Sequence, residues 1–156
     1  MLHTRTEIIS RAVREFEQLD AIIGCLATSA WDVTVSRRDG EDAWTVRDAL
    51  AHITARKQDF VAEFGGPPRR RDGLGVHAYN HVTFEEWHNR PVAELIEWHG
   101  RVQRDLLEAL SAAPESWFMR EAPWPWPAAV DGHSARHRKF DIERALDAQA
   151  KLRVVG

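Results

Sequence analysis

Apolar residues recur at three- and four-residue intervals along four long segments of the chain, with polar residues between them. The segments cover residues 6–26, 45–64, 91–114 and 133–152. Because an α-helix has 3.6 residues per turn, this spacing places the apolar side chains of each segment on one face. Each segment is therefore predicted to be an amphipathic helix that turns its apolar face toward a common core.

Local patterns predict where the helices begin and end. Thr45 is a natural N-cap with Asp48 at the capping-box position, and the Gly-Gly-Pro-Pro run at residues 65–68 ends that helix. A further capping box at residues 83–86 predicts a short helical turn that carries Trp87.

Two connections are rich in Gly, Pro, Arg or Trp. Residues 69–80 contain three consecutive arginines and two glycines, which predicts a mobile connection. Residues 115–130 contain three tryptophans and three prolines, which predicts an irregular loop around the bundle. Four helices with little strand pattern favour an all-α four-helix bundle, and the long connections leave room for a crossover.

Length and composition limit the alternatives. With 156 residues the chain is expected to be a single domain over residues 1–156. The formal net charge of -3 gives no long-range attraction to nucleic acid or to an anionic membrane. No stretch approaches the roughly 20 apolar residues that span a bilayer, and the only cysteine, Cys25, excludes an intrachain disulfide. The expected location is the cytoplasm.

Histidines are the main candidates for chemistry. His52 lies on the second predicted helix, and His133, His137 and Asp141 follow one another at four-residue intervals near the far end. Residues four apart share one side of an α-helix, so the last three form a row that can face one point. Imidazole and carboxylate groups suit Zn, Fe, Ni or Mn, and three protein ligands leave positions for water or substrate. The pattern favours a divalent-metal site between the second and fourth helices.

Five features of the sequence form a recognisable set: the run from Trp44 to His52, the Tyr79-Asn80 pair, the apolar third helix, the Trp-rich loop and the Ser134-Ala135-Arg136-His137 segment. Together they resemble the DinB/YfiT superfamily, and most closely its ClbS/DfsB-like branch. The resemblance implies a four-helix bundle of DinB/YfiT type with long crossover loops, and a metal site of one histidine from the second helix and two from the fourth. It also implies thiol-dependent transferase or isomerase activity, or inactivation of a cyclopropane-bearing natural product as self-protection.

Carried over by position, the resemblance assigns the metal ligands to His52, His137 and Asp141, although the family usually has histidine at the third position. In a second register His133 and His137 are the pair, and Asp141 is an outer acceptor for a histidine N–H. The aspartate fits an Fe, Mn or Zn site, and it also fits a branch that has given up the metal. Arg56, where the branch often has tryptophan, would repel a metal or bind an acidic group.

Other residues are candidates to line a pocket. His99 lies on the apolar face of the third helix, where a structural role competes with a role as general base or extra ligand. Trp87, Trp124 and Trp126 could wall an apolar cavity or pack the loops onto the bundle. Trp44 is interpreted as a packing residue.

Three functions remain open from the sequence. In the first, a metal at His52, His137 and Asp141 activates water, or a low-molecular-weight thiol replaces that water, to open or hydrolyse an electrophilic small molecule. In the second, His52 or His137 is the general base of a metal-free enzyme. In the third, the bundle sequesters a hydrophobic metabolite or drug without catalysis. A homodimer is compatible with each.

Overall fold

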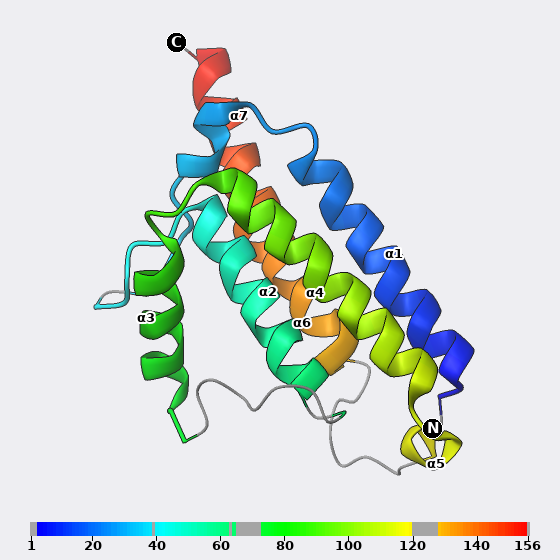
Figure 1. Cartoon of the computed structure of the whole chain (residues 1–156). Helices are drawn as coiled ribbons and strands as arrows, with labels where there is room; N and C mark the ends of the chain where they lie inside the picture. The colour runs from blue at the N-terminus through cyan, green and yellow to red at the C-terminus, as the bar shows by residue number, and fades with distance from the viewer. Residues whose placement is uncertain (1–2, 39, 63, 65–72, 120–127, 156) are drawn as a thin grey trace.

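Every regular element in the described part of the computed structural model is helical (Figure 1). The description covers residues 3–38, 40–62, 64, 73–119 and 128–155. The long helices are α1 (Arg5–Ile23), α2 (Val46–Ala62), α3 (Val76–Trp87) and α4 (Val92–Ala112), and the short ones are the 3-10 helix η1 (Thr28–Asp32) and α5 (Glu115–Phe118). An all-helical fold is therefore confirmed for these residues. None of the helices among them is long and apolar enough to span a bilayer.

The C-terminal helical segment, residues 128–155, changes its winding three times. It consists of η2 (Ala128–Gly132), α6 (His133–His137), η3 (Arg138–Glu143) and α7 (Arg144–Val155), of which η2 and η3 are π-helical. A π-helix joins residue i to i+5, so it holds more residues per turn than an α-helix. The face that α6 presents therefore differs from the one that a uniform helix over residues 133–152 would present.

Helix α2 is the central element of the bundle (Figure 1). It packs against α3 and α4, and the C-terminal segment also contacts it, while α1 packs against α4. One apolar cluster includes Leu50, Ile53 and Trp98, and a second includes Ile8 and Leu106. The helices that carry the predicted apolar stripes thus share a bundle core.

The prediction of a mobile connection over residues 69–80 is wrong for its second half. Residues 76–80 form the first turns of α3, which is much longer than the predicted turn at its end. Tyr79, Thr83 and Trp87 are spaced four residues apart and are all buried. This spacing gives the segment one inward helical face. Burial of that face favours a helix more strongly than the preceding glycines favour a turn. Residues 69–72 lie outside the described residues.

The prediction of an irregular loop over residues 115–130 is also wrong in part. Glu115–Phe118 forms α5, with Pro114 as its N-cap and Phe118 buried against the second apolar cluster. Residues 128–130 belong to η2. Residues 120–127, which include Trp124 and Trp126, lie outside the described residues.

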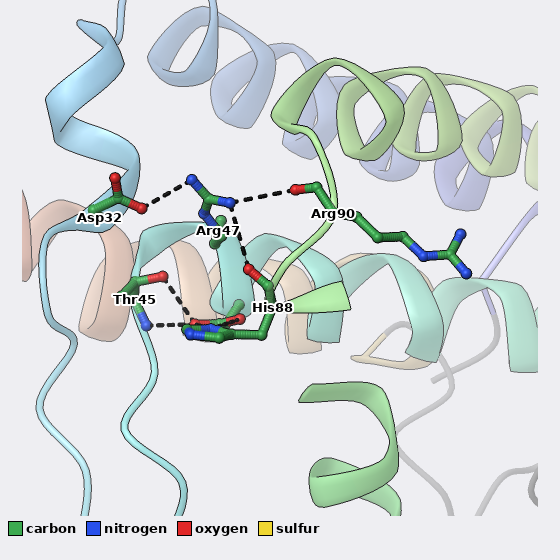
Figure 2. A network of polar contacts seen from close by, with 6 residues as sticks. Asp32, Thr45, Arg47, His88 and Arg90 are labelled. Carbon is green, nitrogen blue, oxygen red and sulfur yellow. Dashed lines mark hydrogen bonds and ion pairs between the residues drawn. The ribbon is translucent and has the colours of Figure 1, made fainter. Parts of the chain in front are cut away.

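A polar network fixes the start of α2 (Figure 2). The Asp48 carboxylate accepts hydrogen bonds from the backbone N–H and from the hydroxyl of Thr45, each at 2.8 Å. His88 Nδ1 donates to the same carboxylate at 3.0 Å. These bonds satisfy polar groups at the helix terminus. They also set the register of His52, which lies one turn after Asp48.

Arg47 joins three parts of the chain at the same end of the bundle (Figure 2). Its Nη2 forms an ion pair with Asp32 of η1 at 2.8 Å. Its Nη1 donates to the backbone oxygens of His88 and Arg90, at 3.4 and 3.3 Å, in the connection between α3 and α4. The start of α2 is therefore tied both to the segment before it and to the α3–α4 turn.

Truncation of a core leucine should destabilise the bundle. Leu50 and Leu106 are both 0% exposed, so Leu50→Ala or Leu106→Ala should lower the free energy of unfolding by about 2 to 5 kcal/mol, because each leaves a cavity. Urea unfolding followed by circular dichroism measures this loss.

Leu152 provides the matched control. The sequence places it on the inner stripe, but it is 76% exposed because α7 extends beyond the other helices (Figure 1). Leu152→Ala should change the free energy of unfolding by less than about 0.5 kcal/mol. A loss below about 1 kcal/mol for Leu50→Ala would contradict the packing of α2.

Candidate metal centre

A buried ion pair orients α6 between its neighbours. Arg138, the first residue of η3, donates from Nε and Nη2 to the two carboxylate oxygens of Glu15 in α1, at 2.9 and 3.0 Å. Ser134, one turn earlier, donates to Glu15 Oε1 at 3.2 Å. All three residues are buried. His133 and His137 each directly precede one of the residues bound to Glu15, so they lie on an adjoining face of the helix, where they meet α2.

His52, His133 and His137 converge between α2 and α6. Nε2 of His52 lies 3.1 Å from Nε2 of His133, and the ring centroids of the three pairs are 4.9, 4.6 and 4.5 Å apart. One nitrogen from each ring can be chosen so that all three lie within 4.8 Å of one another. Zn–N bonds of 2.0–2.1 Å at tetrahedral angles would separate two nitrogens by about 3.3 Å. The three histidines therefore lie close enough together to bind a metal ion.

Asp141 contacts His137 and is not a member of the histidine cluster. Its Oδ2 lies 2.5 Å from His137 Nδ1. The carboxylate accepts the Nδ1 hydrogen, so the lone pair of His137 is on Nε2, which is the usual arrangement for a metal-binding histidine. The geometry corresponds to the register in which His133 is a ligand and Asp141 an outer acceptor. His52 Nδ1 is buried and has no such acceptor among the described residues.

Burial keeps His52 and His133 neutral. Desolvation lowers the pKa of His52 well below its usual value, and the neighbouring His133 and His137 lower it further. Desolvation also lowers the pKa of His133 to about 3, with smaller contributions from His137, Arg56 and Arg136. A metal binds the neutral form of imidazole, so protons compete weakly for His52 and His133 near neutral pH.

Aromatic rings enclose the histidines. The Trp44 ring lies 5.0 Å from the His52 ring and 6.5 Å from the His137 ring, centroid to centroid. The rings of Tyr79 and His52 form a T-shaped pair with centroids 6.3 Å apart, and the Arg37 guanidinium stacks over Trp44 at 3.5 Å from a ring centroid. Trp44 packs into the core, as its sequence interpretation states, and it also forms a wall of the site. In the sequence, Trp44 directly precedes Thr45, the cap of the helix that carries His52. This position was the signal from which its place beside the site could have been inferred.

A pocket of about 480 Å³ borders the cluster at His137 and Asp141. This volume lies in the range of small-molecule sites, about 300 to 1,000 Å³. Arg37, Arg38 and Glu41 from the segment before α2 line it together with Arg136 and Phe140 from the C-terminal segment. No sequence pattern indicates a role for these arginines, because the two segments that carry them are distant in the chain.

Other candidates lie away from this pocket. The His99 ring stacks on Phe16 with centroids 5.0 Å apart, and its Nδ1 lies 3.1 Å from the Thr54 hydroxyl. Trp87 stacks on Trp98 at 4.0 Å. Both candidates are buried, and neither lines the pocket described here. They therefore contact core residues in this structure.

Arg56 lies beside the histidine cluster, at the surface. Its guanidinium is 5.0 Å from the centroid of the Tyr79 ring, and its charge contributes to the lowered pKa of both His52 and His133. It is thus close enough to act on the cluster electrostatically, although it does not line the pocket.

Comparison with known proteins finds solved structures with a similar fold. The structure resembles that of an uncharacterised protein from Escherichia coli UTI89, with a TM-score of 0.67 and 11% identity over 88% of this chain and 92% of that one. It also resembles an uncharacterised protein from Clostridium difficile 630, with a TM-score of 0.66 and 13% identity over 92% and 96% of the two chains. No family model and no curated protein matches the chain. Similarity at this identity supports a shared helical fold and carries no activity with it.

Loss of Glu15 should destabilise the protein, because Arg138 would remain buried without its main counter-charge. Removing one member of a buried ion pair costs about 3 to 5 kcal/mol. Gln18 and Glu143 also accept hydrogen bonds from Arg138, so Glu15→Gln should cost about 3 kcal/mol in urea unfolding. Glu17→Gln, at an exposed position of the same helix, is the control and should cost less than about 0.5 kcal/mol. Equal losses in both variants would contradict a special role for Glu15.

His99 should make the stability depend on pH. Burial lowers its pKa to about 3, whereas a histidine in the unfolded chain titrates near 6.5. Below pH 6.5 the unfolded state binds a proton that the folded state excludes, so stability is complete above this pH and falls as the pH approaches 3. For one group the loss is about 1.4 kcal/mol per pH unit. Between about pH 6 and pH 4, the free energy of unfolding should therefore depend less steeply on pH in His99→Gln than in the unsubstituted protein, by about this amount. The same pH dependence in both proteins would contradict a neutral His99.

Proposed function

We propose that this chain is a metal-dependent enzyme that modifies an electrophilic small molecule at a site formed by His52, His133 and His137. The observation that supports the proposal is the convergence of three imidazole nitrogens within 4.8 Å, beside a pocket of small-molecule size. A divalent ion held by these residues, such as Zn, Ni, Fe or Mn, would act as a Lewis acid and would activate water or a low-molecular-weight thiol. Three protein ligands leave room for substrate.

The surrounding residues have distinct roles in this proposal. Asp141 keeps the proton of His137 on Nδ1, which leaves Nε2 free to bind. Trp44 covers His52 and His137 and excludes water from that side. The pocket gives a substrate access to His137. The chain would thus supply a shielded set of ligands that a substrate can approach from this pocket.

The resemblance to the DinB/YfiT superfamily, and to its ClbS/DfsB-like branch, supports the same assignment. It implies a helical bundle with one histidine from the second long helix and two from the last. We therefore extend the proposal to the family's reactions, which are the opening or hydrolysis of an electrophile such as a cyclopropane, or the transfer of a thiol. Self-protection against a reactive metabolite is the corresponding biological role.

A second candidate function is metal-free general-base catalysis. The specific observation is the His137–Asp141 pair, whose 2.5 Å contact lies at the edge of the pocket. An aspartate in this position stabilises the imidazolium that forms when Nε2 accepts a proton. His137 would then take a proton from a water molecule that attacks the substrate.

Metal analysis tests the first function. Untagged protein is stripped with a chelator, offered Zn, Ni, Mn and Fe in turn, and measured by elemental analysis. We expect one ion per chain, and its loss from His52→Ala, His133→Ala and His137→Ala, because each variant removes one of three ligands. His81→Ala, at an exposed histidine, is the matched control and should retain the ion. Protein that retains no metal under any of these conditions would overturn the proposal.

Asp141→Asn tests the outer contact of the site. It keeps all three imidazoles and removes only the carboxylate that orients His137, so metal affinity should fall by about 10- to 100-fold without complete loss. If metal is instead lost from Asp141→Ala and retained in His133→Ala, the ligands are His52, His137 and Asp141, as in the first register.

Activity separates the remaining functions. Turnover of an epoxide or cyclopropane probe that survives chelation and is lost in folded His137→Ala would support general-base catalysis. Probe binding without turnover, in the presence and absence of metal, would instead indicate sequestration.

A further inference from the structure

We propose that the pocket beside His137 binds the carboxylate of a small organic acid through Arg38 and Arg136, and that the acid has an apolar or aromatic body. This inference rests on the proposed function, since it names a substrate class for the same site. Its binding step does not require the metal, so the two proposals can fail separately.

The charged side chains that line the pocket favour a ligand with one negative charge. Three arginines and two carboxylates face it. Glu41 is paired with Arg37 at 3.2 Å, and Asp141 accepts a hydrogen bond from His137. The side chains of Arg38 and Arg136 are exposed and form no ion pair with any residue that the structure describes. The pocket thus has one positive charge in excess, and a guanidinium can bind a carboxylate through two parallel hydrogen bonds.

The environment of the histidine cluster is also cationic. The Arg37 guanidinium lies over Trp44 and that of Arg56 lies over Tyr79, and both of these rings adjoin His52. The three imidazoles are neutral ligands and do not compensate this positive field. An anionic substrate would therefore be held at this site more strongly than a neutral one of the same shape.

Phe140 and the size of the pocket indicate the rest of the molecule. Phe140 is a large apolar residue that is 62% exposed, and it lines the same pocket as the two arginines. An apolar group that packs against its ring would be removed from water while the carboxylate remains on the guanidinium groups. The volume of about 480 Å³ accommodates a small acid of this kind.

Two matched probes test the proposal on the full chain after chelation. Phenylacetate carries the charge and the aromatic body, whereas phenylacetamide has the same shape without the charge. Isothermal titration calorimetry at neutral pH and low salt should show the acid binding at least about tenfold more tightly than the amide, because charge-assisted hydrogen bonds exceed neutral ones. Added salt should weaken the binding of the acid selectively.

Arginine variants locate the contact. Arg38→Gln and Arg136→Gln should each weaken phenylacetate binding by about tenfold and leave phenylacetamide binding unchanged. Arg144→Gln, at an exposed cation of α7 outside the pocket, is the matched control and should bind phenylacetate normally. Circular dichroism and urea unfolding verify that each variant is folded.

The outcomes separate this inference from the proposed function. Equal binding of acid and amide, no binding of the acid at millimolar concentration, or equal loss in Arg144→Gln would each overturn the inference. If the acid binds as expected while no metal is retained, the carboxylate site stands and the metal-dependent function fails. If metal is retained and the acid does not bind, the metal-dependent function stands and the carboxylate site fails.

Discussion

The buried ion pair between Glu15 and Arg138 is the contact on which the arrangement of the site depends. Two oxygens of Glu15 accept hydrogen bonds from Arg138, and Ser134 binds the same carboxylate. A buried charge without a partner is costly, so the rotation of α6 about its axis is restricted to positions that keep these bonds. His133 and His137 lie one residue before the bound side chains. The contact with α1 therefore determines that both imidazoles face α2, although it lies outside the histidine cluster.

Neutral ligands in a cationic environment give the site its chemical character. His52 and His133 are held neutral by burial, and the only carboxylate in direct contact with a clustered imidazole, among the residues described, is Asp141. Arg37, Arg56 and Arg136 add positive charge nearby. A site of this kind would leave the charge of a bound dication largely uncompensated, which strengthens its attraction for anions. The proposed carboxylate pocket and the proposed metal site thus share a positively charged environment, and His137 belongs to both.

The fold was largely predictable from the spacing of apolar residues, and the errors have physical causes. The segments 45–64 and 91–114, which contain the buried Leu50 and Leu106, are predicted correctly as helices with an inward apolar face, because long amphipathic helices repeat the same pattern many times. Residues 76–80 were assigned to a connection because the local composition favours turns, whereas the burial of Tyr79 and Thr83 stabilises a helix. Leu152 fits the apolar stripe and is nevertheless exposed, because the end of α7 extends beyond the other helices that the structure describes (Figure 1).

The amino-acid sequence was enough to predict the all-helical class, the α2 cap at Thr45 and Asp48, and the candidate histidines, because each depends on residues within one or two helical turns of each other. Which of these histidines meet depends on how the helices pack. A winding change in η2 and η3 shifts the helix faces and is not visible as a periodic pattern, so the sequence left two registers open for His133 and Asp141. The pocket arginines come from segments about a hundred residues apart, and only packing of the helices brings such distant charges to one place.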